Sequence, residues 1–246
     1  MIRVGVLGAL GRMGATVCDA VLAADGLELV ASLDQGDSLD QLVTNGAQVV
    51  VDFTVPESVM ANLTFAMTNN IHAVVGTTGW DDARLAEVRE LQAASQANIL
   101  IAPNFGLAAV LMMQFAAKAA PYFESVEIVE LHHPRKADAP SGTARRTAEL
   151  IAEARTAAGS EPMPDATRDL LDGARGAVIG DIHIHSVRLQ GLVAHQEVIL
   201  GGPGESLTIR HDSYDRESFM PGVVLGVREV AKHHGVTYGL EHILGL

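Results

Sequence analysis

The chain has 246 residues, of which 48% are hydrophobic, and a formal net charge of −13 at pH 7. This length permits one large domain or two smaller ones. The acidic charge argues against nucleic acid or an anionic membrane as the main partner, and no apolar stretch is long enough to span a bilayer. We expect no secretory leader, because the sequence leads directly into the first predicted strand, and the single cysteine, Cys18, excludes an internal disulfide. We therefore expect a soluble cytoplasmic protein.

The first part of the chain alternates short apolar runs with amphipathic segments. Strands are predicted at 2–7, 27–33, 48–53, 72–75 and 97–102. Helices are predicted at 12–24, 56–69, 81–94 and 106–120. Nearly continuous apolar strands that alternate with helices are typical of a parallel sheet covered on both faces. This pattern predicts an α/β fold with a Rossmann-like parallel sheet at the N-terminus.

A glycine-rich turn joins the first predicted strand to the first helix. Its glycines would let the backbone approach a pyrophosphate at the helix N-terminus. Asp34 ends the second strand, about 20 residues further on, where an acid can accept hydrogen bonds from the adenosine ribose. Because the spacing is G-x-x-G-x-x-G rather than G-x-G-x-x-G, a turn that binds no ligand is the alternative. The residues expected to bind a dinucleotide are Gly8, Ala9, Leu10, Gly11, Arg12, Met13 and Asp34.

The cofactor preference is open at this point. Gln35 after Asp34 favours NADH, since an arginine there would better suit a 2′-phosphate, whereas Arg12 leaves NADPH open. Other predicted strands end in groups that could complete a cofactor rim, because ligands of parallel sheets bind beyond the carboxyl ends. Taken singly, each of these ends could be an ordinary turn. The rim candidates follow three strands and are 52–54, Gly76, Thr77, Thr78, Asn104 and Phe105.

After residue 105 the pattern changes. Strands are predicted at 124–132, 182–190, 192–200 and 205–212, mostly without helices between them, and 157–180 is expected to be a long loop. We therefore predict a second domain at 106–216 with a mixed, largely antiparallel sheet, one face covered by helices and the other free for subunit contact. The helix from Met220 to His234 and a strand at 236–240 are expected to return to the first domain, which comprises 1–105 and 217–246.

Titratable groups crowd the segment 127–144, which reads EIVELHHPRKADAPSGTA. Pro134 is expected to end a strand just after His132 and His133, and Lys136 follows. A histidine suits general acid work and a lysine suits a carboxylate. Ser141 is a plausible N-cap that leaves the next backbone N–H groups pointing outward. The alternative is a surface loop before a capped helix, but the whole array favours an anionic substrate that needs proton transfer.

This segment closely resembles the signature of the 4-hydroxy-tetrahydrodipicolinate reductase (dihydrodipicolinate reductase) family. The glycine-rich turn, 76–78 and Ala102-Pro103-Asn104-Phe105 match the same family, so the resemblance covers essentially the entire chain. It implies an NADH- or NADPH-dependent oxidoreductase of lysine and diaminopimelate biosynthesis. The implied reaction is hydride transfer to a cyclic, imine-type dicarboxylate with loss of a hydroxyl as water, which gives tetrahydrodipicolinate. Ala102 and Pro103 thereby join the expected cofactor rim.

The resemblance also implies individual roles. His132 would be the proton donor or acceptor and Lys136 a second proton donor, while His133 and the amides of Gly142 and Thr143 would hold a substrate carboxylate. A homotetramer joined through the sheets of the second domains is expected. Two departures from the family pattern concern the cofactor. Leu10 stands where some members have glycine or lysine, and Gln35 where others have arginine.

Two other functions are compatible with parts of this pattern. One is another two-domain nicotinamide-dependent dehydrogenase, and the other is an NAD(P)-sensing regulator without catalysis. The absence of a basic DNA-binding segment weighs against the regulator. A metal site built from His183, His185 and His195 is a further alternative, but no cysteine or clear acidic ligand accompanies them, so no metal is predicted.

Overall fold

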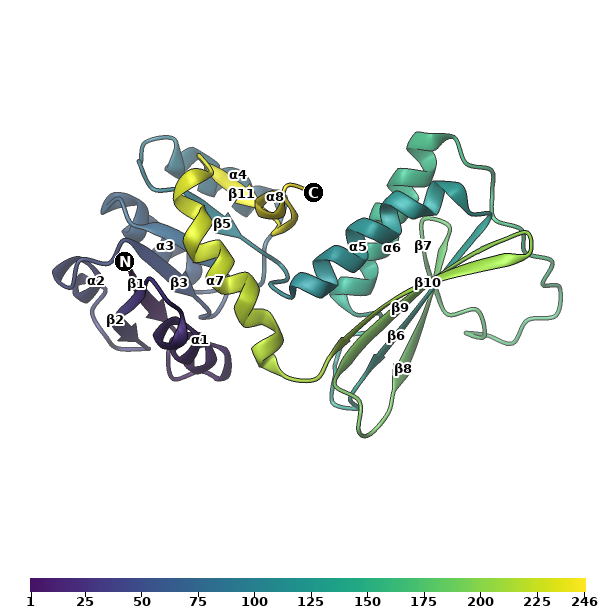
Figure 1. Cartoon of the computed structure of the whole chain (residues 1–246), viewed down its shortest axis with the longest axis horizontal. Helices are drawn as coiled ribbons and strands as arrows, with labels where there is room; N and C mark the ends of the chain where they lie inside the picture. Colours follow the sequence, from purple (N-terminus) through teal and green to yellow (C-terminus); the bar gives the residue numbers. More distant parts are fainter. The chain divides into compact units, whose positions relative to one another are not determined.

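The computed structural model describes all 246 residues and divides into two compact units (Figure 1). Unit 1 comprises Met1–Leu107 and Arg216–Leu246, and unit 2 comprises Ala108–Asp215. Each unit has one sheet with helices packed on it, so the predicted fold class is confirmed. No helix combines the length and the apolar character needed to cross a membrane.

The sheet of unit 1 has six strands in the order β11-β5-β4-β3-β1-β2, all parallel. The strands are β1 (Ile2–Leu7), β2 (Leu27–Leu33), β3 (Val49–Asp52), β4 (His72–Val75), β5 (Ile99–Ile101) and β11 (Val236–Tyr238). Because the strands are parallel, their carboxyl ends lie along one edge of the sheet. β11 pairs with β5 although the whole of unit 2 lies between them in the sequence.

Helices cover both faces of this sheet. They are α1 (Arg12–Ala23), α2 (Asp40–Thr44), α3 (Val59–Thr68), α4 (Asp82–Gln92), α7 (Met220–Glu229) and α8 (Glu241–Leu244), with the 3₁₀ turns η2 (Arg216–Phe219) and η3 (Val230–Lys232). α1 packs against α7, and α3 packs against α4 (Figure 1). Since successive strand residues face opposite ways, both faces must be apolar. Accordingly, Val50 and Val51 are both fully or almost fully buried.

One helix of unit 1 begins later than expected, another was not expected, and α7 ends at Glu229 rather than at His234. α3 begins at Val59 rather than at Pro56, because the carbonyl of Val55 accepts hydrogen bonds from Ser58 and Val59 and closes a turn before the helix. α2 was not predicted. It has five residues and buries only Leu42, so it is too short to show a helical period.

The sheet of unit 2 has five strands in the order β10-β9-β6-β8-β7, and only the β6–β8 pair is parallel. The strands are β6 (Ser125–His132), β7 (Ala177–Ile179), β8 (Ile182–Arg188), β9 (Ala194–Gly202) and β10 (Glu205–Ser213). β7 lies inside the segment expected to be a loop, since three residues at a sheet edge carry little sequence signal. The helices are α5 (Leu107–Ala119), α6 (Gly142–Ala158) and the 3₁₀ turn η1 (Ala120–Tyr122).

The two faces of this second sheet differ in burial. α6 packs on β6 and β8 (Figure 1), and the β6 residues Val126, Ile128 and Glu130 are at most 1% exposed. The residues between them in the strand are partly exposed. An acidic residue therefore shares the buried face with two aliphatic ones, and its partners are described with the site below.

Arg155 connects three segments of unit 2 through hydrogen bonds from its side chain to backbone carbonyls. The residue is 3% exposed. Nη1 donates to the carbonyls of Ala120 (3.3 Å) and Phe123 (2.7 Å), and Nη2 donates to the carbonyl of Glu161 (2.9 Å). The guanidinium thus satisfies carbonyls at the first residue of η1, directly after η1 and beyond the end of α6.

Arg155→Ala should destabilise unit 2 by about 3 kcal/mol, because it leaves buried carbonyls without donors and opens a cavity. Urea denaturation of the full chain measures the change. Arg146→Ala is the matched control, since Arg146 lies on the same helix, is 49% exposed and pairs with Glu149, so its loss should cost under about 1 kcal/mol. Equal unfolding midpoints for the two variants would contradict the role of Arg155.

Candidate active site

The glycine-rich turn of unit 1 closes tightly between β1 and α1. Gly8 has φ +77°, and its amide and that of Ala9 both donate to the carbonyl of Leu33, at 2.9 and 3.0 Å. Gly11 is the N-cap of α1 and makes no side-chain cap. A Cβ on Gly14 would lie 2.0 Å from the carbonyl oxygen of Gly8. Helix and turn therefore approach more closely than any side chain permits, and the first amides of α1 remain available to an anion.

Asp34 lies at the carboxyl end of β2, next to this turn. Its carboxylate accepts hydrogen bonds from the amides of Gln35 and Leu10, both at 2.8 Å. These two amides hold the pKa of Asp34 below its ordinary value. The turn thus places Leu10 beside Asp34, and both Leu10, which is 87% exposed, and Arg12 are exposed.

A buried carboxylate connects the loops that follow β3 and β4. Asp52 is 1% exposed and accepts hydrogen bonds from Thr54 Oγ1, Thr77 Oγ1 (both 2.7 Å) and Asn62 Nδ2 (2.8 Å). The Thr77 hydroxyl is therefore engaged inside the protein. Its backbone, with the neighbouring Gly76 and Thr78, forms the loop at the carboxyl end of β4.

The segment Ala102–Phe105 follows β5. Ala102 and Phe105 are 3% exposed, while Pro103 is exposed. The Phe105 ring lies 5.8 Å from that of Phe53, centroid to centroid, and Asn104 Oδ1 accepts a hydrogen bond from the amide of Gly106 at 2.8 Å. The loops after β3, β4 and β5 thus lie at the same edge of the sheet as the glycine-rich turn.

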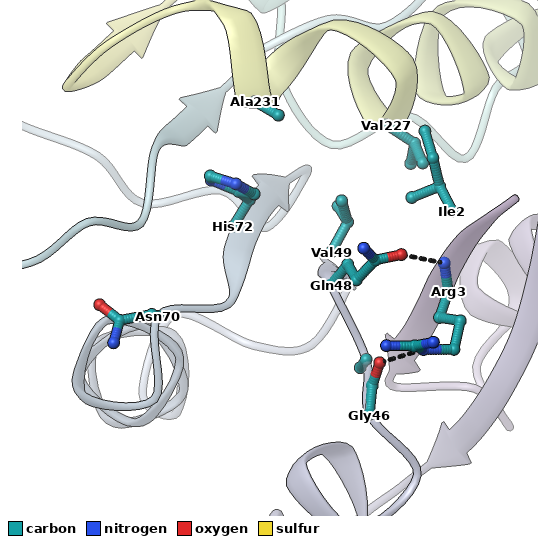
Figure 2. Close-up of a pocket in the computed structure, with 10 residues that line it drawn as sticks. Ile2, Arg3, Gly46, Gln48, Val49, Asn70, His72, Val227 and Ala231 are labelled. Carbon is teal, nitrogen blue, oxygen red and sulfur yellow. Dashed lines mark hydrogen bonds between the residues drawn. The ribbon is translucent and has the colours of Figure 1, made fainter.

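The pocket in Figure 2 lies at the opposite edge of this sheet. It has a volume of about 400 Å³ and is lined by the starts of β1, β3 and β4 together with Val227 and Ala231 (Figure 2). Arg3 donates through its amide to Gln48 Oε1 at 3.1 Å. None of the predicted site residues lines this pocket, so it is separate from the cofactor rim.

In unit 2, β6 ends at His132, before Pro134. His132 and Glu130 lie two residues apart on the same face of the strand. His132 Nδ1 donates to Glu130 Oε2 at 2.5 Å, and the two side chains are 14% and 0% exposed. The ring is thus anchored through one nitrogen.

Glu130 has further partners that sequence analysis did not assign. Arg188 Nη1 and Nη2 donate to its two oxygens, each at 2.8 Å, and the amide of Ser141 donates at 3.2 Å. Burial raises the pKa of the Glu130 carboxyl, but hydrogen bonds from His132, Arg188 and Ser186 outweigh it and lower the pKa to about 2. The sequence signal that could have revealed this buried carboxylate is the alternation along β6, which places an acidic residue on the same face as Val126 and Ile128.

The segment between β6 and α6 carries the other predicted residues. Lys136 Nζ lies 2.7 Å from Asp138 Oδ1, with side chains 22% and 50% exposed. Burial raises the pKa of Asp138, whereas the hydrogen bond from Lys136 lowers it and prevails. His133 Nδ1 is buried without a hydrogen-bond partner. The structure therefore collects His132, His133 and Lys136 at one end of β6.

α6 begins directly after this segment. Ser141 is its N-cap, as predicted, and its Oγ accepts a hydrogen bond from the amide of Ala144 at 3.2 Å. Gly142 and Thr143 are the first two residues of the helix. A Cβ on Gly142 would meet no atom within 4 Å, and the Gly142 backbone hydrogen-bonds to the Asp138 carboxylate and helps to lower its pKa.

The three histidines weighed as a metal site have separate partners. His183 Nδ1 bonds to the carbonyl of Arg175 (2.7 Å), His185 Nε2 to Glu127 Oε2 (2.5 Å) and His195 Nδ1 to Asp212 Oδ1 (2.6 Å). No group of three or more His, Cys, Asp or Glu side chains in the chain is arranged to hold a metal ion.

Family models cover both parts of this arrangement. Residues 2–105 match the model described as dihydrodipicolinate reductase, N-terminus, and residues 108–244 match dihydrodipicolinate reductase, C-terminus. The chain belongs to the dihydrodipicolinate reductase family.

Individual relatives agree with this family over their full lengths. The chain is 63% identical to a 4-hydroxy-tetrahydrodipicolinate reductase of Nocardia farcinica, covering 100% of this chain and 99% of the relative. It is 61% identical to that of Streptomyces griseus, with 100% and 98% covered. A solved dipicolinate-bound dihydrodipicolinate reductase of Paenisporosarcina sp. TG-14 is 41% identical, with a TM-score of 0.89 and 99% of each chain covered.

These comparisons confirm three expectations from the sequence. The resemblance to the dihydrodipicolinate reductase family is correct, the fold class is that of a solved member, and the chain is an oxidoreductase that uses a nicotinamide cofactor.

Proposed function

We propose that the chain reduces 4-hydroxy-tetrahydrodipicolinate to tetrahydrodipicolinate with NADH or NADPH, in the biosynthesis of diaminopimelate and lysine. The observation that carries the proposal is the cluster at the end of β6, where a proton-exchanging histidine, a lysine and a helix N-terminus come together. The names of the full-length relatives support the same reaction. In this assignment unit 1 binds the dinucleotide, and unit 2 binds the substrate and forms the subunit contacts.

The substrate roles follow from charge. A dicarboxylate needs cationic and hydrogen-bonding partners, which Lys136, His133 and the amides of Gly142 and Thr143 would supply. The buried, unpaired Nδ1 of His133 supports this assignment. The Lys136–Asp138 pair also supports the role of Lys136, because the lysine ammonium group already binds a carboxylate of the chain.

The proton roles follow from geometry. Since His132 Nδ1 faces Glu130, Nε2 is the nitrogen left to exchange a proton with the substrate. Hydride addition and loss of the hydroxyl as water together consume one proton, so a donor must be present. His132 serves as the proton donor or acceptor, and Lys136 is the second donor.

The cofactor would be bound by the turn from Gly8 to Met13, by Asp34, by Gly76–Thr78 and by Ala102–Phe105. These residues fit a dinucleotide, because the close Gly8–Gly14 approach and the uncapped start of α1 leave backbone amides for a pyrophosphate. When bound, the nicotinamide supplies the hydride.

The test is steady-state oxidation of NADH and NADPH, in parallel, by the purified chain with 4-hydroxy-tetrahydrodipicolinate. We expect turnover that depends on this substrate. Turnover with a sugar or semialdehyde but not with the cyclic dicarboxylate would indicate a different dehydrogenase. Cofactor binding without turnover of any substrate would indicate a sensor, and either result would overturn the proposal.

We expect kcat/KM to be about tenfold higher with NADH than with NADPH, because the Asp34 carboxylate would repel a 2′-phosphate. Asp34→Asn should bring the two values closer, since it removes this charge. The kinetics above measure the ratio, and Asp37→Asn is a control beside the same loop. A wild-type preference for NADPH would contradict the role of Asp34 and would favour Arg12 as the phosphate ligand.

The partly exposed face of the unit 2 sheet supports the expected homotetramer. This face carries Glu127, Val129 and Leu131 of β6 and lies opposite α6. In the proposed assembly these faces pair between subunits in the cytoplasm, and light scattering of the purified chain tests the tetramer.

A further inference from the structure

The proposed reaction requires that one particular nitrogen of His132 meets the substrate. In a neutral imidazole, the nitrogen that donates a hydrogen bond carries the proton and the other holds the lone pair. His132 Nδ1 faces the Glu130 carboxylate at 2.5 Å, and a carboxylate can only accept. The neutral ring is thereby held as the Nδ1–H tautomer with Nε2 turned away from Glu130.

We propose that Glu130 is a positioning residue that fixes the tautomer and orientation of His132 and ties that ring to the start of α6. This inference rests on the proposed function, since it takes His132 as the group that exchanges a proton with the substrate.

Glu130 is itself held in a single orientation. Arg188 contacts both carboxylate oxygens at 2.8 Å, and its Nη1 and Nη2 also donate to the carbonyls of Val187 (2.8 Å) and Asp138 (2.7 Å). Such a bidentate pair constrains the plane of the carboxylate. Because hydrogen bonds lower the pKa of Glu130 to about 2, the group remains ionised at neutral pH and keeps accepting from Nδ1.

The same carboxylate reaches the helix that is proposed to hold substrate. Glu130 Oε1 accepts a hydrogen bond from the amide of Ser141 at 3.2 Å, and Ser141 Oγ caps Ala144. The buried Glu130 carboxylate therefore fixes the position of the His132 ring relative to the first turn of α6. A displacement of Glu130 would disturb both together.

Two variants separate positioning from stability. Glu130→Gln keeps the shape and one acceptor but removes the charge. The double variant Glu130→Leu with Arg188→Met removes both members of the buried pair, which disturbs folding less than leaving one charge unpaired. For each we would measure kcat, the NADH dissociation constant and the ¹⁵N shifts of the His132 ring, assigned by comparison with His132→Gln.

We expect the double variant to bind NADH normally, to lose kcat on the order of 10²-fold, and to shift the His132 proton from Nδ1 toward Nε2. Glu130→Gln should show a smaller loss of kcat. Gln196→Leu is the matched control. Gln196 pairs with Glu130 across β6 and β9, is 3% exposed and donates to Thr147 Oγ1 at 2.8 Å. Its loss disturbs the same buried face, and we expect kcat and the tautomer to be unchanged.

A folded double variant with wild-type kcat and an unchanged Nδ1–H signal would overturn the inference. So would an equal loss of kcat in Gln196→Leu, because that would indicate a general effect of packing. Absence of turnover in the wild type would overturn the proposed function instead, and the ring shifts would still decide whether Glu130 sets the tautomer.

Discussion

Lys136→Ala should reduce kcat by on the order of 10³-fold while the dissociation constant for NADH stays unchanged. The ammonium group is proposed both to bind a substrate carboxylate and to donate a proton, and alanine provides neither. The proposed NADH site lies in unit 1, whereas Lys136 belongs to unit 2, and we therefore expect NADH binding to be independent of this side chain. Stopped-flow turnover and fluorescence titration with NADH measure the two quantities.

Lys118→Ala is the matched control for this prediction. Lys118 also lies in unit 2, in the last turn of α5, and is exposed, so it tests the loss of a positive charge outside the cluster. We expect its kcat to match the wild type. Near-normal turnover in Lys136→Ala would remove this lysine from the chemistry, whereas an equal fall in both variants would trace the effect to net charge.

Gly14→Ala should lower both the stability of unit 1 and its affinity for NADH. The added Cβ would lie 2.0 Å from the carbonyl oxygen of Gly8 and 3.0 Å from the Cα of Ala9. These are backbone atoms, so the clash cannot be relieved by a rotamer change, and α1 must move away from the turn. We expect a loss of stability on the order of 3 kcal/mol and NADH affinity weakened by at least about tenfold.

Thermal unfolding and NADH titration of the variant measure these effects. Gly201→Ala is the control, because a Cβ on Gly201 would meet no atom within 4 Å. It should unfold as the wild type does and bind NADH equally well. If Gly14→Ala also bound NADH normally, the close approach of helix and turn would not be needed for the proposed cofactor site.

The sequence predicts most of unit 1 because its signals are local. A buried parallel strand needs apolar residues on both faces. A glycine is needed at Gly14 of α1, because the backbone of the turn after β1 lies too close for a Cβ. What it missed was short or set by tertiary contacts. α2 buries one side chain, and the start of α3 depends on a turn around Val55.

The candidate site was predictable only in part for the same reason. His132, Lys136 and Ser141 stand close together in sequence and chemistry, so a motif reveals them. The Glu130–Arg188 pair joins residues 58 apart in the chain, and only the pairing of β6 with β8 brings them together. Alternation along β6 indicates that Glu130 is buried, but it does not say which cation compensates it.

The contact between Lys136 and Asp138 has a consequence for selectivity. On the proposed assignment the incoming dicarboxylate does not meet a bare ammonium group, because Asp138 already occupies it at 2.7 Å. Binding is then an exchange of one carboxylate for another. The free energy of releasing Asp138 is the same for every competing anion, so anions that bring no further contacts gain little. The Asp138 carboxylate therefore lowers the affinity of the site for simple organic acids.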